Sequence, residues 1–170
     1  RFNRWANPVI PETAPKDRQG NRSNYMAWGL LQLPKNQGEY SLYATEAYYT
    51  GPDSRVRRFT YRVDGFVSAH AEETTGHLIT KPIIFQGNTL ALNLVTAENG
   101  FIAVEIQDLE GNPIPGFSLT DCEPCRGDKI AQQVTWQNAP PLQTLAGRPV
   151  KLKFAIHNGD LYSYQFTAKR

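Results

Sequence analysis

The sequence is poor in the side chains that most often bind metals or carry redox chemistry. It has two cysteines, three histidines and one methionine in 170 residues, and both cysteines, Cys122 and Cys125, lie in a single Cys-x-x-Cys. A structural zinc ion takes about four such ligands, and His70, His77 and His157 are spread along the chain. A reactive thiol pair would need a β-α-β unit that lowers its pKa, and no such pattern is present. We therefore expect ordinary loop cysteines, either free or joined in a small strained loop.

Long apolar runs and blocks of like charge are also missing. No run approaches the roughly 20 apolar residues that span a bilayer, and the 18 basic and 16 acidic residues are interspersed. These absences argue against a membrane or nucleic acid partner. Residue 1 is arginine, which predicts that the chain is a processed or excised part of a longer protein.

Turn formers and aromatic residues are plentiful. The chain has 13 glycines, 12 prolines, 8 tyrosines, 8 phenylalanines and 3 tryptophans, a composition that favours strands and turns over helices. We expect an all-β protein. Residues 1–24 are rich in proline and polar breakers, so they predict an extended arm that packs over the domain or over a neighbour.

Residues 25–64 predict an antiparallel meander of three strands joined by short turns. The expected strands are residues 25–33, 39–49 and 55–64. Their residue pattern does not separate into one apolar and one polar face, so the sheet should be partly buried on both sides, as a propeller blade is. A three-stranded sheet of this kind is not stable alone, and we expect it to pack on the rest of the chain or on a partner.

Residues 65–170 predict an antiparallel β-sandwich or jelly roll, because short strands with one apolar face each recur at regular spacing. The alternation is clearest where Leu90, Leu92 and Leu94 share one face, and residues 101–108 repeat it. A strand is expected to end at Trp136. A last hairpin is predicted from residues 150–156 and 161–167. The boundary with the meander is placed between Asp64 and Gly65.

Several segments resemble a known family. They read DGFVSAHA, HLITKPIIF, NTLALNLVT, GFIAVEIQDLEGNPIPGFSLTDCEPCRGD, LAGRPVKLKFAI and DLYSYQF. They are similar to the C-terminal β-sandwich of extracellular bacterial proteins that resemble glycoside hydrolases with five-bladed β-propellers. The segment from Ser23 to Ser68 is similar to the last blade that leads into this sandwich. The resemblance implies an extracellular or periplasmic protein, but the remaining blades are missing, so enzyme activity is not carried over to this chain.

Hydrolysis of a glycoside needs two carboxylates about 5 to 10 Å apart. The candidates are Glu46 with Asp53, and Asp121 with Glu123 and Asp128. Glu46 stands among tyrosines, a setting that would raise the pKa of its carboxyl group. The alternative, which we favour, is that these acids form ion pairs with Arg55 or Arg126 and hold loops in place.

Sugar binding needs exposed aromatic faces and a few polar partners, and arginine favours anionic sugars. The candidate ligand-binding residues are Tyr48, Tyr49, Arg55, Arg57, Trp136 and Tyr162. Trp136 and Trp28 are more simply explained as core residues. A structural calcium ion is conceivable at the loop acids Asp108, Glu110, Asp121 and Asp128. No other cofactor and no catalytic residue is expected.

Three hypotheses follow from these patterns. The first is a non-catalytic accessory module that binds carbohydrate. The second is a structural domain that docks on a catalytic propeller chain, and the third is part of a glycoside hydrolase active site.

Overall fold

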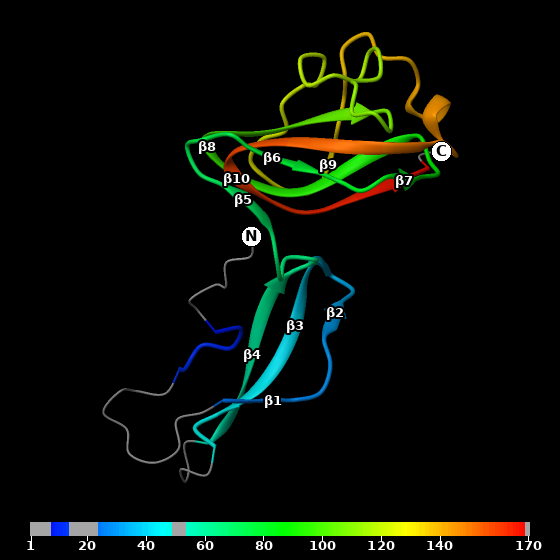
Figure 1. The fold of residues 1–170 in the computed structure, drawn as a ribbon. Coiled ribbons are helices and arrows are strands. Elements are labelled where there is room, and N and C mark those ends of the chain that lie inside the picture. Colours follow the sequence, from blue (N-terminus) through cyan, green and yellow to red (C-terminus); the bar gives the residue numbers. More distant parts are fainter. Residues whose placement is uncertain (1–7, 14–23, 49–53, 169–170) are drawn as a thin grey trace. The chain divides into compact units, whose positions relative to one another are not determined.

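The computed structural model describes residues 8–13, 24–48 and 54–168, and it divides the chain into unit 1, Arg1–Val63, and unit 2, Asp64–Arg170 (Figure 1). The fold is all-β with antiparallel sheets, as expected. Among the described residues the one helical element is a single 3₁₀ turn, η1 (Leu142–Leu145). No helix in this part of the chain has the length and apolar character that crossing a membrane requires.

Unit 1 contains an antiparallel sheet centred on one long strand. The strands are β1 (Tyr25–Met26), β2 (Leu31–Leu33), β3 (Asn36–Glu46) and β4 (Arg55–Arg62). β3 pairs with β4 along one edge and with β1 and β2 along the other. The expected first strand is thus broken in two, and Gly29 between the halves has φ +95°, a conformation that favours glycine.

The two faces of this sheet differ in burial. Leu42, Ala44 and Glu46 point to one face and are buried, because alternate residues of a strand share a face. On the other face, Thr45 of β3 lies between two cross-strand neighbours. They are Tyr25 of β1 and Val56 of β4. Tyr25 and Val56 are exposed. One side of the sheet is therefore largely covered, and the other is largely open apart from Ser41, which is fully buried.

The described part of the arm lies against the covered side. The Tyr61 hydroxyl donates a hydrogen bond to the Val9 carbonyl oxygen. Asn24 donates through Nδ2 to the Pro11 carbonyl oxygen at 2.9 Å and to Thr13 Oγ1 at 3.2 Å. Residues 8–13 thus pack on unit 1 itself.

Unit 2 is built around two strands of 19 residues each, β8 (Thr89–Gln107) and β10 (Pro149–Thr167). The sheet order is β5-β10-β8-β9, and two further short strands also pair with β10. The shorter strands are β5 (Ala69–Ala71), β6 (Gly76–Ile79), β7 (Ile83–Ile84) and β9 (Asp128–Gln133). β9 ends before Trp136, where the sequence predicted a longer strand.

The predicted last hairpin is wrong. Residues 150–156 and 161–167 belong to the single strand β10, which pairs with β8 from Lys151 to Thr167 with two register shifts. One shift lies at His157 and Gly159, where the ribbon of β10 turns back on itself (Figure 1). A Cβ on Gly100 would stand 2.2 Å from the Asn158 carbonyl oxygen. This close approach lets the bend of β10 lie on the bend of β8.

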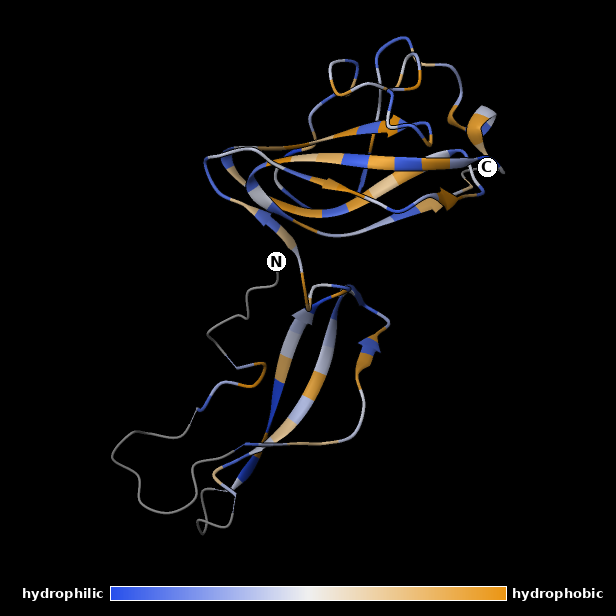
Figure 2. Ribbon diagram, in the orientation of Figure 1, coloured by the Kyte–Doolittle hydropathy of each residue, from blue (hydrophilic) through white to orange (hydrophobic). Residues whose placement is uncertain are grey.

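The core of unit 2 follows the predicted alternation. Leu90, Leu92 and Leu94 are fully buried, and they join one cluster with Leu152, Phe154 and their neighbours. Hydrophobic and hydrophilic colours alternate along β10 in Figure 2. The segment that contains the cysteines is irregular and is attached by the isolated bridges Ile102–Cys125 and Cys122–Trp136.

Candidate functional site

In the described part of unit 1, a group of charges surrounds the buried carboxylate of Glu46. Register pairs Glu46 with Arg55 across β3 and β4. The Arg55 Nε donates to Glu46 Oε2. Arg57 donates to the same oxygen through Nη2 at 3.1 Å, and its Nε lies 2.9 Å from Oε1. The carboxylate is 1% exposed, whereas both arginine side chains are about half exposed.

The expectation of a raised pKa at Glu46 is wrong. Burial does raise it, but hydrogen bonds from Thr13, Arg55 and Arg57, with the positive charge of Arg55, outweigh burial and lower the pKa to about 2. A group that stays ionised at neutral pH cannot act as a general acid. Its predicted companion, Asp53, lies outside the described residues. Glu46 therefore holds strands and arm together, as the ion-pair alternative predicted.

The acids of the cysteine segment hold turns in place. Asp121 accepts hydrogen bonds from the backbone nitrogen of Ser118 at 3.1 Å and from its hydroxyl group at 2.6 Å. Glu123 accepts one from Thr135 Oγ1 at 2.7 Å. Arg126 donates to the Gly100 carbonyl oxygen and lies over the ring of Phe101, rather than pairing with either acid.

Both cysteines are buried and free. Burial raises the pKa of Cys122 to about 11 and that of Cys125 to about 12. The Cys122 sulfur accepts a hydrogen bond from the backbone nitrogen of Val104 at 3.2 Å. Because the thiolate is the reactive form, these thiols are poor nucleophiles at neutral pH.

Two of the predicted calcium ligands, Asp108 and Asp121, accept hydrogen bonds from the chain itself. Asp108 accepts hydrogen bonds from the backbone nitrogen of Asn112 at 2.8 Å and from its side-chain amide at 3.1 Å. Those bonds lower the pKa of Asp108. Within the described ranges no three His, Cys, Asp or Glu side chains come close enough to hold a metal ion. A calcium ion here stays a prediction.

The predicted aromatic residues are not gathered in one place. Trp136 packs edge-on against Phe117 at 5.3 Å and donates through Nε1 to the Val104 carbonyl oxygen at 2.8 Å, so it is part of the core wall of unit 2. Tyr162 lies in β10, also in unit 2. The Tyr48 ring contacts Tyr25 in unit 1, at 4.9 Å between centroids, and Tyr49 falls outside the described residues. Of the five predicted residues that the structure describes, Arg55 and Arg57 meet at Glu46.

Trp28 is the residue that sequence reasoning misplaced most. It was expected in the core, but it is fully exposed in the loop between β1 and β2. The signal was the glycine that follows it, since positive φ at Gly29 ends the alternation of the strand.

The sheet of unit 1 has an exposed surface that we call the open face. Its exposed apolar members are Tyr25, Leu31 and Val56. Tyr43 and Arg58 lie opposite each other between them, and Arg58 is fixed by bonds to Ser41 Oγ at 2.9 Å and Glu39 Oε1 at 2.8 Å. The open face thus combines an apolar surface with an oriented guanidinium group.

The two units carry opposite net charge. Residues 1–63 contain 10 Lys and Arg against 5 Asp and Glu, and residues 64–170 contain 8 against 11. The basic excess of unit 1 includes the four arginines of β4, which are Arg55, Arg57, Arg58 and Arg62.

Comparisons with protein-family models, with curated proteins and with solved structures found no match for this chain.

Proposed function

We propose that the chain is a non-catalytic accessory module of an extracellular or periplasmic protein, and that unit 1 docks through its open face on a neighbouring β-sheet. The occupant we propose is a blade of a glycoside-hydrolase-like β-propeller. Unit 2 is a β-sandwich whose large hydrophobic core makes the module stable.

The observation that carries the proposal is the small core of unit 1. Among its described residues the buried hydrophobic side chains are Leu42, Ala44 and Ala47. Burying one leucine contributes about 1.5–3 kcal/mol, whereas ordering each residue costs about 1–2 kcal/mol of backbone entropy. So small a core does not balance the cost of ordering an eleven-residue central strand and its neighbours. Further burial against a partner would supply the missing stabilisation.

The chemistry of the open face suggests what the partner presents. Tyr25, Leu31 and Val56 are exposed on one side of a regular sheet, and two sheets that pack face to face bury such residues about 10 Å apart. Arg58 and Arg62, the two arginines of β4 that lie on the open face, favour acidic residues around the partner's apolar centre.

The proposal is tested by capture from the source organism with the tagged chain, followed by identification of the bound proteins. We expect a β-propeller protein that is retained by the wild-type chain and lost with Val56→Asp. Ile130→Asp is the matched control, because Ile130 is an exposed apolar residue of unit 2. Capture that the two substitutions affect equally, or no capture of a propeller protein, would contradict docking through the open face.

Carbohydrate binding is a second candidate function, and the full exposure of the Trp28 indole favours it. Exposed indoles stack on the apolar face of sugar rings. Titration with neutral and anionic polysaccharides should then change the tryptophan fluorescence of the wild-type chain but not that of Trp28→Phe. Trp136→Phe is the control that keeps the response.

A further inference from the structure

The outer edge of the sheet in unit 2 carries an apolar strip. β5, β6 and β7 all pair with β10, and among the described strands β6 pairs with β10 alone. Leu78 is 40% exposed, Ile79 53% and Ile84 67%. Register places Leu78 opposite the fully buried Phe154. Leu78 therefore faces the core side of the sheet and is exposed because no described strand lies beyond it.

An exposed strand edge of this composition is a template for another strand. We propose that two copies of the chain associate by antiparallel pairing of β6 with β6 of the second copy, around a two-fold axis at His77. In this register Thr75 lies opposite Ile79 of the second copy, and Gly76 lies opposite Leu78. The proposal does not depend on the open face of unit 1.

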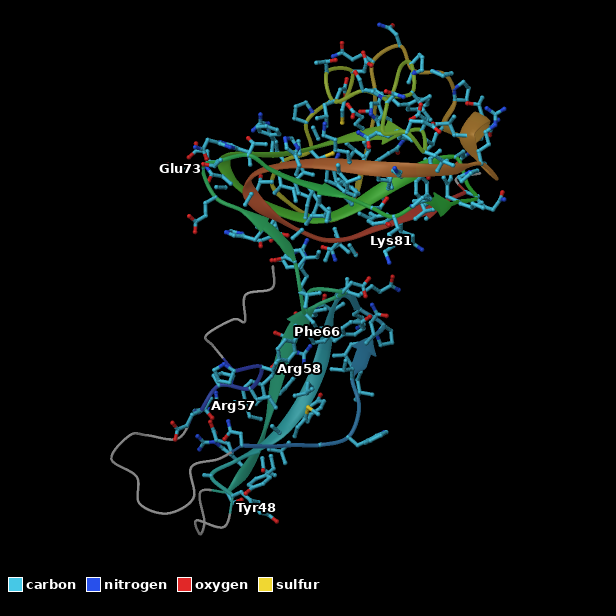
Figure 3. The ribbon with its side chains drawn as sticks, viewed as in Figure 1. Tyr48, Arg57, Arg58, Phe66, Glu73 and Lys81 are labelled. Atoms are coloured by element: carbon cyan, nitrogen blue, oxygen red, sulfur yellow. The ribbon has the colours of Figure 1, made fainter. Side chains whose placement is uncertain are left out.

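The charges on either side of β6 favour a second copy as the occupant. Glu73 lies four positions before His77 and Lys81 lies four positions after it. Figure 3 labels these two residues, and they lie well apart in that view. Antiparallel pairing around His77 brings Glu73 of each copy towards Lys81 of the other, twice per dimer.

The backbone on either side of β6 limits the length of the paired segment. Glu72, Glu73 and Thr74 line an open depression just before β6. The Asn158 backbone nitrogen donates to the Glu72 carbonyl oxygen at 2.9 Å and so fixes this loop. On the other side β6 ends at Ile79, and Pro82 lacks an N–H group that could extend the pairing. The paired segment is thus confined to residues 75–79, and Glu73 and Lys81 lie in the non-strand residues that flank it.

The test is sedimentation equilibrium of the full chain, with its Lys81→Glu and Glu73→Lys variants. We expect a dimer for the wild type. Lys81→Glu should raise the Kd of the dimer by about tenfold or more, because it turns two symmetry-related attractive charge pairs into repulsive ones. Glu73→Lys should have a smaller effect, since Glu72 remains beside it. The double variant Glu73→Lys/Lys81→Glu should recover much of the affinity.

A mixing experiment sharpens the test. Tagged Lys81→Glu and untagged Glu73→Lys should form mixed dimers in native mass spectrometry more readily than either variant forms its own dimer, because only the mixed pair restores opposite charges. Circular dichroism of each variant checks that it folds. A chain that stays monomeric at about 100 µM, a concentration on the order of the Kd of a weak interface, would overturn the proposal. So would a dimer that Val56→Asp dissociates and Lys81→Glu does not.

Discussion

Units 1 and 2 are both antiparallel sheets, but they differ in what lies beneath the sheet. Unit 2 has a continuous cluster that includes Leu94, Val104 and Phe154, all inaccessible to solvent. Unit 1 has well-paired strands but, in its described part, only Leu42, Ala44 and Ala47 as buried hydrophobic residues. Backbone pairing sets the shape of a sheet, whereas the buried apolar area decides whether it is stable alone. We therefore expect the two units to respond differently to the same perturbations.

The largest difference is expected when the units are produced separately. Residues 64–170 should fold as a fragment with a cooperative thermal transition, whereas residues 1–63 should give none, because their core is too small. Circular dichroism and calorimetry measure both. A cooperative transition of the fragment 1–63 would show that unit 1 stabilises itself, and the comparison would fail.

Removing a core side chain tests unit 2 directly. Phe154→Ala should lower its free energy of unfolding by about 3–5 kcal/mol, the range for a buried aromatic residue. Denaturant unfolding of the full chain gives the value. Leu42→Ala serves as the contrasting variant in unit 1, and it should leave the main transition in place. A loss under about 1 kcal/mol for Phe154→Ala would mean that this core is loosely packed.

Lowering the pH tests how much the ion pairs of Glu46 stabilise unit 1. The pKa of Glu46 in the folded protein is about 2, against 4.5 for an unperturbed carboxyl group. Its contribution to stability is therefore complete above pH 4.5 and is lost as the pH falls towards 2. Glu46→Gln should cost about 1–3 kcal/mol at neutral pH and should remove this pH dependence, as read from hydrogen exchange of β3 and β4 amides.

The control for Glu46 is Glu39→Gln, which affects a more exposed carboxylate that pairs with Arg58. An exposed ion pair contributes about 0–1 kcal/mol, so this variant should be nearly silent. Equal losses in the two variants would contradict a special role for the buried carboxylate.

The smallest effect is expected at the exposed indole. Trp28→Ala should change the free energy of unfolding of the isolated chain by no more than about 0.5 kcal/mol. The reason is that the Trp28 side chain is fully exposed and so buries no apolar area on folding. Trp136→Ala should cost about 2 kcal/mol or more, since it removes a packed ring and the hydrogen bond to Val104. Thermal denaturation separates the two variants, and a large loss for Trp28→Ala would show that the loop is part of the fold.

The sequence predicted local patterns better than long-range ones. Alternation of Leu90, Leu92 and Leu94 identified a core-facing strand correctly, and turn residues located the strands of unit 1 to within a few residues. The break at 157–160 was misread as a hairpin, because a turn signal does not reveal whether the flanking strands pair with each other or both pair with β8.

The candidate site was harder to predict from sequence than the fold. Glu46 was singled out correctly as an unusual carboxyl group, but the direction of its pKa depends on hydrogen bonds from Thr13 and Arg57, which are distant in sequence. Trp28 has the more apolar neighbours in the sequence, and only the fold shows that it is exposed whereas Trp136 is packed.

The central position of β10 has a consequence for synthesis of the chain. β10 joins β5, β6, β7 and β8, yet it occupies residues 149–167 and so leaves the ribosome after all four of them. Until then the apolar side chains of β8 have no strand on that side, and the pairs to be formed are distant in sequence, which slows folding. A nascent chain stalled before Pro149 should therefore remain open to chaperones and proteases, and premature termination there should leave no native unit 2.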